Sequence, residues 1–185
     1  YWTDAECDLM FKELKLSIMR IRISPDENNW GTLLECCRYA TGTYGVRILA
    51  TPWTMPASMK DTGSLNASDN GTLSHLKETS YEDYAKWLEK FAKYMKDNGA
   101  PLYAISVQNE PDWPAPYEGC NWTGEQILNF VKNYGGLITS AKLVSGESMS
   151  MNRAYYDGIL NDKAACDNID IIAGHLYGVP APLSY

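Results

Sequence analysis

The sequence lacks several features that define large classes of proteins. No apolar run approaches the ~18–20 residues of a membrane-spanning helix. Basic residues are in the minority, with 16 Lys and Arg against 23 Asp and Glu, and the formal charge of −7 argues against a nucleic-acid partner. The 185 residues are enough for one globular domain with a substantial core, and the charge fits a neutral or weakly charged ligand.

Metal-binding patterns are also missing. Only two histidines are present, His75 and His175, and none of the five cysteines has a CxxC spacing. We therefore expect neither a metal ion nor an organic cofactor. The adjacent Cys36 and Cys37 lie in a helical pattern and are expected to be packed thiols rather than a bridge.

Phenylalanine is scarce among the aromatic residues, with three Phe against six Trp and thirteen Tyr. Trp and Tyr combine an apolar face with a polar tip. Most are expected in the core, but those in loops at an active edge could stack on carbohydrate.

Hydrophobic periodicity predicts helices and strands in alternation. Helices are expected over residues 4–14, 28–41, 81–97, 123–136 and 152–160, and strands over 17–23, 46–50, 102–107, 142–145 and 169–174. The polar residues 61–74 are expected to form a long surface loop. Such alternation indicates an α/β fold with a parallel sheet and right-handed crossovers.

The strand near residue 105 leads into the main candidate site. Pro111 ends the extended segment, so Asn109 and Glu110 lie at the carboxyl end of a strand, where ligands bind in parallel α/β folds. A carboxylate beside an amide, with Trp113 close by, suits an acid/base acting on a sugar. The alternative is an ordinary loop carboxylate that makes a cap or a surface ion pair.

Other strand ends carry further candidates. Arg20 and Arg22 share one face of their strand, so Arg20 either makes an exposed ion pair or orients a catalytic carboxylate. Trp53, between two prolines, is either a buried anchor or a sugar platform. The last strand delivers His175 and Tyr177.

Four segments, at residues 17–30, 50–56, 104–112 and 170–178, resemble glycoside hydrolase family 30, a family of retaining enzymes built on (β/α)₈ barrels. Ile105-Ser106-Val107-Gln108-Asn109-Glu110-Pro111-Asp112 and His175-Leu176-Tyr177-Gly178 are most similar to its bacterial and fungal xylanase subgroup. The resemblance implies that the five strands are the second to the sixth of a barrel. The chain is therefore expected to be an incomplete catalytic barrel over residues 1–185, lacking the first and the last two strands; an open five-stranded sheet is the alternative.

The resemblance also implies roles for individual residues. Glu110 matches the general acid/base, Asn109 the amide that binds the sugar 2-hydroxyl, and Arg20 an arginine near the nucleophile. Trp53 and Tyr177, with His175 beside them, match residues that line the sugar subsites. Trp113 and Trp122 are weaker subsite candidates.

The family's nucleophile, a glutamate after the seventh strand, has no counterpart in this sequence. Glu147 follows the fifth strand instead, so we interpret it as a wall or structural residue. The resemblance implies an endo-β-1,4-xylanase or glucuronoxylanase, secreted and monomeric, that acts on a polysaccharide, and the isolated fragment is expected to be inactive. Alternatives are a β-glucosidase, glucosylceramidase or β-1,6-glucanase of the same family, or a carbohydrate-binding protein without catalysis.

Overall fold

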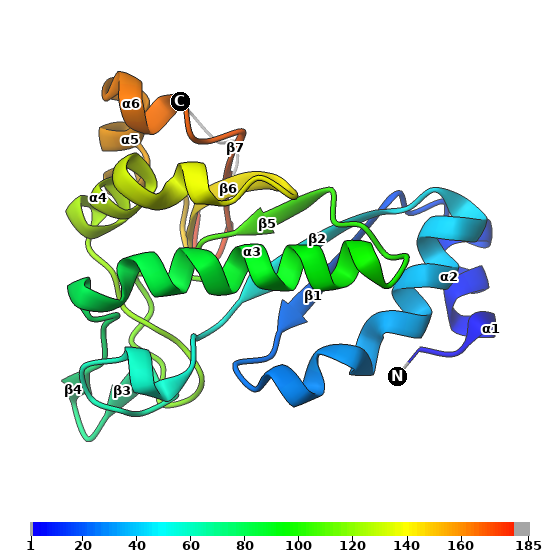
Figure 1. The fold of residues 1–185 in the computed structure, drawn as a ribbon, viewed down its shortest axis with the longest axis horizontal. Helices are drawn as coiled ribbons and strands as arrows, with labels where there is room; N and C mark the ends of the chain where they lie inside the picture. The colour runs from blue at the N-terminus through cyan, green and yellow to red at the C-terminus, as the bar shows by residue number, and fades with distance from the viewer. Residues whose placement is uncertain (1, 180–185) are drawn as a thin grey trace.

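The computed structural model describes residues 2–179, and its central feature is a five-stranded parallel sheet (Figure 1). The strands pair in the order in which they occur along the chain, as the alternating pattern predicted. They are β1 (Ile18–Ile23), β2 (Arg47–Pro52), β5 (Ala104–Ser106), β6 (Lys142–Ser148) and β7 (Ile171–Gly174). This sheet confirms the predicted α/β fold and brings all five carboxyl ends of the strands to one edge.

The connections between strands are helical. They comprise α1 (Asp4–Cys7), the π-helix η1 (Asp8–Glu13), the 3₁₀ helix η2 (Glu27–Leu33), α2 (Leu34–Tyr44), α3 (Tyr81–Asp97), α4 (Gly124–Tyr134), α5 (Asp157–Asn161) and α6 (Lys163–Cys166), with short 3₁₀ turns η3 (Ala57–Met59), η4 (Glu78–Ser80), η5 (Gly135–Leu137) and η6 (Arg153–Tyr155). The segment predicted as a single helix over residues 152–160 is helical but divided into η6 and α5, because Tyr156, with φ of −140°, leaves the helical conformation between them. The short helix α6 follows, and Asp162 caps it. None of the helices among residues 2–179 has the length and apolarity to cross a membrane.

Helix α3 is the main layer over the sheet and runs across its near face in Figure 1. Its bounds agree with the predicted helix, and its apolar stripe, which includes Tyr84, Leu88 and Met95, is buried. The Tyr84 hydroxyl donates a hydrogen bond of 2.7 Å to the carbonyl of Val107. This bond fixes the backbone at the end of β5, directly before the candidate site.

Cys36 and Cys37 are packed thiols, as predicted. Cys36 and Cys37 are buried, and all five cysteine side chains are free thiols. The adjacent pair on α2 therefore packs in the core and forms no bridge.

The polar stretch at residues 61–74 lies mostly at the surface, as predicted, but it is not without secondary structure. It contains a small antiparallel hairpin of β3 (Ser68–Asp69) and β4 (Thr72–Leu73), which turns at Asn70 and Gly71 with φ of 49° and 82°. The amide of Ala67, just before the hairpin, donates to the carbonyl of Tyr117, 2.9 Å away. The hairpin is thereby joined to the segment that follows β5.

A buried lysine holds these two segments together. Lys60 is fully buried, and its ammonium donates to Thr54 Oγ1 (3.2 Å) and to the carbonyls of Leu65 (3.3 Å), Asn66 (2.7 Å) and Gly119 (2.5 Å). A buried charge is tolerated only when hydrogen bonds replace the lost water. The ammonium therefore acts as an internal cross-link between the loops after β2 and β5.

Replacing Lys60 by Met tests this cross-link. The substitution leaves several buried carbonyl oxygens without a donor, so we expect the free energy of unfolding to fall by about 3 kcal/mol. Denaturant unfolding measures the change, and Lys12→Met, at an exposed position, is the control. Equal stability of the two variants would contradict the assignment.

Candidate active site

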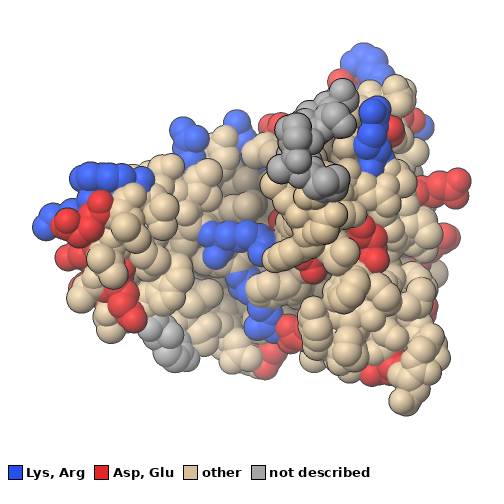
Figure 2. Space-filling model, turned by 180° about the vertical axis from the view of Figure 1, so that it is seen from behind, with Lys and Arg blue, Asp and Glu red and all other residues tan. Residues whose placement is uncertain are grey.

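The candidate active site is a cleft of about 590 Å³ at the carboxyl ends of the strands. Every strand of the sheet except β6 contributes directly or through the loop that follows it. The lining residues are Arg20, Arg22, Trp53, Asn109, Glu110, Tyr117, Glu118, His175 and Tyr177. Figure 2 shows the face of the molecule opposite to α3, which is hollowed, with Lys and Arg side chains in the hollow.

Glu110 and Glu147 are held by an unusual backbone arrangement. Both have positive φ, 43° and 33°, and the amide of Glu110 donates to the carbonyl of Glu147, 3.0 Å away. Positive φ in a non-glycine residue costs on the order of 1–3 kcal/mol and is concentrated at functional sites. Strained backbone therefore occurs at the ends of two neighbouring strands, β5 and β6.

The carboxylate of Glu110 points toward β7. Its Oε1 lies 2.7 Å from Nδ1 of His175, and its side chain is 16% exposed. The other ring nitrogen of His175 lies 3.6 Å from Oε1 of Glu147. One imidazole therefore contacts both carboxylates.

These contacts shift two pKa values. The pKa of His175 is raised, first by its interaction with Glu147 and also by Glu110, although burial opposes the shift. Burial alone would raise the pKa of Glu147, but the interactions with His175 and Arg20 outweigh it, and the pKa is lowered. Glu147 is thus a buried anion, and His175 favours its cationic form.

Arg20 connects the strand ends from the other side. Its Nη2 donates to Oδ1 of Asn109 (2.7 Å) and to Oε1 of Glu147 (3.1 Å), whose side chain is 3% exposed. Because Oδ1 of Asn109 accepts from Arg20, the Nδ2 amide is left to donate to a ligand. The exposed ion pair considered for Arg20 is replaced by an ion pair with a buried carboxylate.

Two guanidinium groups lie close to the ring of Trp53. The Cζ atoms of Arg20 and Arg22 are 5.7 and 5.8 Å from its ring centroid, within the range of cation–π attraction. The backbone carbonyl of Trp53 accepts from Nε2 of Gln108 at 2.6 Å. The Trp53 ring lines the cleft and is only partly buried, so the buried-anchor alternative is wrong.

The structure brings together six of the seven predicted site residues. Glu110, Asn109, Arg20, Trp53, His175 and Tyr177 all line the cleft. Trp113 does not: it is 42% exposed and lies in the turn after Glu110, where its amide donates to the Glu110 carbonyl. Its assignment as a subsite residue stays a prediction.

Trp122 is wrong as a subsite candidate. It is 3% exposed, and its ring packs against Tyr81 and Phe130 with centroid distances of 5.6 Å. Its indole Nε1 donates to Oε1 of Gln108, 3.3 Å away. Trp122 is a core residue that supports the strand end from behind.

The sequence reasoning missed several residues of the site. Glu147 was predicted to be a wall or structural residue and not a member of the site, yet it contacts two of the cleft side chains. Glu118 and Tyr117 gave no signal in a loop of mixed composition. Arg22 could have been found, because it alternates with Arg20 on the same face of β1. Among residues 2–179, no three side chains of His, Cys, Asp or Glu are arranged to hold a metal ion.

Comparison with known proteins accounts for this arrangement. The model of the glycosyl hydrolase family 30 TIM-barrel domain matches residues 31–181. The chain belongs to glycosyl hydrolase family 30. The chain is also 39% identical over 166 residues to glucuronoxylanase XynC of Bacillus subtilis (strain 168), and the alignment covers 90% of the chain.

Solved structures of family 30 enzymes show the same fold. A subfamily 8 xylanase, Xyn30A from Clostridium acetobutylicum, superposes with a TM-score of 0.88 and 41% identity over 97% of this chain. A family 30 endoxylanase from Clostridium papyrosolvens C71 gives 0.84 and 36% over 96%. The five-stranded sheet is therefore part of a (β/α)₈ barrel. This chain spans 38% of the Bacillus protein and 47% of each Clostridium chain.

The titration of His175 tests the contact between the imidazole and the two carboxylates. The folded-state pKa of His175 is raised, so protonated His175 stabilises the folded protein. This contribution to the free energy of unfolding is complete below the unfolded-state pKa of about 6.5 and is lost as pH rises through the folded-state pKa. We expect an NMR titration midpoint above about 6.5, which Glu147→Gln and Glu110→Gln each lower. Glu125→Gln, on the exposed face of α4, is the control; a midpoint that neither variant moves would refute the contact.

Proposed function

We propose that this family 30 chain carries the acid/base half of a retaining endo-β-1,4-xylanase or glucuronoxylanase. The observation that carries the proposal is the cleft itself, in which the Glu110 carboxylate, the Asn109 amide and the Trp53 ring face one cavity. The similarity to proteins described as xylanases and a glucuronoxylanase supports the substrate class.

The side chains suit the binding of a sugar ring. Trp53 offers an apolar face with the two arginines close to its ring, and Tyr177, after β7, is an exposed aromatic side chain of the same lining. The Nδ2 amide of Asn109 would donate to the 2-hydroxyl of the sugar next to the scissile bond. A hydrogen bond at that hydroxyl strengthens in the transition state of glycoside hydrolysis.

Glu110 would act first as an acid and then as a base. Protonated Glu110 donates its proton to the glycosidic oxygen as the bond to the anomeric carbon breaks. A second carboxylate, about 5–5.5 Å from the first in retaining enzymes, attacks the anomeric carbon and forms the glycosyl-enzyme. Glu110 then removes a proton from the water that releases the sugar. His175 holds the Glu110 carboxyl in position throughout.

Glu147 is a positioning residue in this scheme. It is buried, and its charge is neutralised by Arg20 and His175, so it is poorly placed to attack a sugar. We assign the nucleophile to a glutamate on a seventh strand, outside residues 1–185. The chain would accordingly be part of a catalytic barrel completed by a first strand and two last strands, in a secreted, monomeric enzyme that degrades xylan.

Glu110→Gln tests the acid/base role in the enzyme that contains this chain. Loss of general acid–base catalysis is expected to lower kcat/KM on xylan by about 10²–10⁴-fold. An aryl xyloside with a good leaving group needs no protonation, so its glycosyl-enzyme should still form and accumulate as a burst of released phenol. Glu125→Gln serves as the matched control. A Glu110→Gln variant with full activity on xylan would rule out the assignment. If the unsubstituted protein bound xylan without hydrolysing it, and Glu110→Gln left that affinity unchanged, the result would favour a binding protein.

A substrate panel tests the glycan class. We expect the unsubstituted enzyme to release xylo-oligosaccharides from xylan and glucuronoxylan, and to leave β-1,6-glucan and glucosylceramide intact. Product analysis by chromatography distinguishes these outcomes. Hydrolysis of either glucoside at a higher kcat/KM than xylan would replace the proposal with one of the other activities known in this family.

A further inference from the structure

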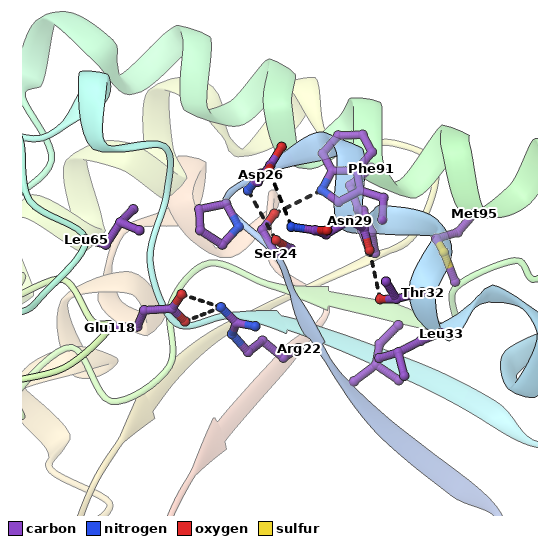
Figure 3. A pocket seen from close by; sticks show the side chains of 13 residues that line it. Arg22, Ser24, Asp26, Asn29, Thr32, Leu33, Leu65, Phe91, Met95 and Glu118 are labelled. Carbon is purple, nitrogen blue, oxygen red and sulfur yellow. Dashed lines mark hydrogen bonds and ion pairs between the residues drawn. The ribbon is translucent and has the colours of Figure 1, made fainter. Parts of the chain in front are cut away.

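A second cavity of about 530 Å³ lies beside the cleft, at the same edge of the sheet (Figure 3). Its volume is within the range of about 300–1,000 Å³ that is typical of small-molecule sites. It is bounded by the end of β1, the helix η2, one face of α3 and the loops that contain Leu65 and Glu118. We call this cavity the side pocket.

The side pocket combines an apolar floor with a polar rim. Phe91 and Met95 reach into it from α3 and are themselves buried, so they close its base. Asp26, Asn29 and Thr32 are exposed at the rim. An apolar base with a few hydroxyl- and amide-bearing side chains suits a sugar ring, which has apolar faces and hydroxyl edges.

The side pocket and the cleft share one wall. Arg22 and Glu118 line both cavities, and their ion pair stands between them. Both carboxylate oxygens of Glu118 accept from a single nitrogen of Arg22, Nη2. Within residues 2–179, the Nε and Nη1 groups of Arg22 make no hydrogen bond, so their donors remain for a ligand that spans the wall.

The charges of the side pocket disfavour an acidic ligand. Arg22 and Glu118 neutralise one another, and Asp26 is the remaining charged residue of the lining, so the net charge is −1. The closed base excludes a chain that passes through. A terminal, uncharged unit fits both constraints.

We infer that the side pocket is a subsite for an uncharged sugar unit that branches from the glycan bound in the cleft. The inference rests on the proposed function, because it takes the cleft to hold a sugar chain. The branch would cross the Arg22–Glu118 wall, donate and accept hydrogen bonds at the rim, and place one face against Leu33 and Leu65, which are accessible apolar side chains of the lining.

NMR titration of the Glu110→Gln protein separates the two sites. The Trp53 indole N–H reports on the cleft, and the Met95 methyl group reports on the side pocket. Three ligands share one β-1,4-xylo-oligosaccharide backbone: unbranched, with one arabinose branch, and with one uronic-acid branch. We expect all three to shift Trp53, and only the arabinose-branched ligand to shift Met95 and to bind about tenfold tighter than the unbranched one.

A blocking variant completes the test. Asn29→Trp fills the rim and should bring the ratio of branched to unbranched affinity close to one, whereas Asn133→Trp, exposed on α4, should leave the ratio unchanged. Shifts at Trp53 without shifts at Met95 would overturn the side pocket and leave the proposed function standing. An equal response of Met95 to the uronic-acid branch would overturn the inference of an uncharged ligand. If none of the three ligands shifted either the Trp53 or the Met95 signal, the proposed function would be overturned, and this inference with it.

Discussion

The contact on which the site depends is the guanidinium of Arg20, which joins three strands at their ends. It binds Asn109 beyond β5 and Glu147 on β6, and it also lies over the ring of Trp53 beyond β2. The carboxylate of Glu147 is buried, and its charge is tolerated because Arg20 and His175 compensate for the lost water. The backbone hydrogen bond from the amide of Glu110 to the carbonyl of Glu147 then links the backbone of the proposed acid/base to this buried carboxylate residue.

Features with local causes could be predicted from the sequence. Helix α3 occupies the predicted residues 81–97, because its apolar spacing is regular over almost five turns and Asn98-Gly99 ends it. Thr123 and Gln126 form the predicted capping box, since the motif is complete within four residues. The convergence of Glu110 with the other strand ends followed from the parallel sheet, in which all strands end at one edge.

Features with tertiary causes could not be predicted. Trp122 follows a loop rich in proline and was a candidate for a sugar subsite, but it completes an aromatic cluster with residues of α3 and α4. Lys60 precedes a polar stretch, and nothing local shows that carbonyls from two loops surround it. The pairing of Arg22 with Glu118 joins residues 96 positions apart, so the wall between the cleft and the side pocket is invisible in the sequence.

A crystal structure of the Glu110→Gln enzyme with a bound xylo-oligosaccharide tests the central claim most directly. The expected result is a glycosidic oxygen within about 3.2 Å of the side chain at position 110, with one sugar ring against Trp53 and its 2-hydroxyl bonded to Asn109. A chain bound elsewhere on the molecule, or a glycosidic oxygen outside hydrogen-bond reach of position 110, would contradict the account.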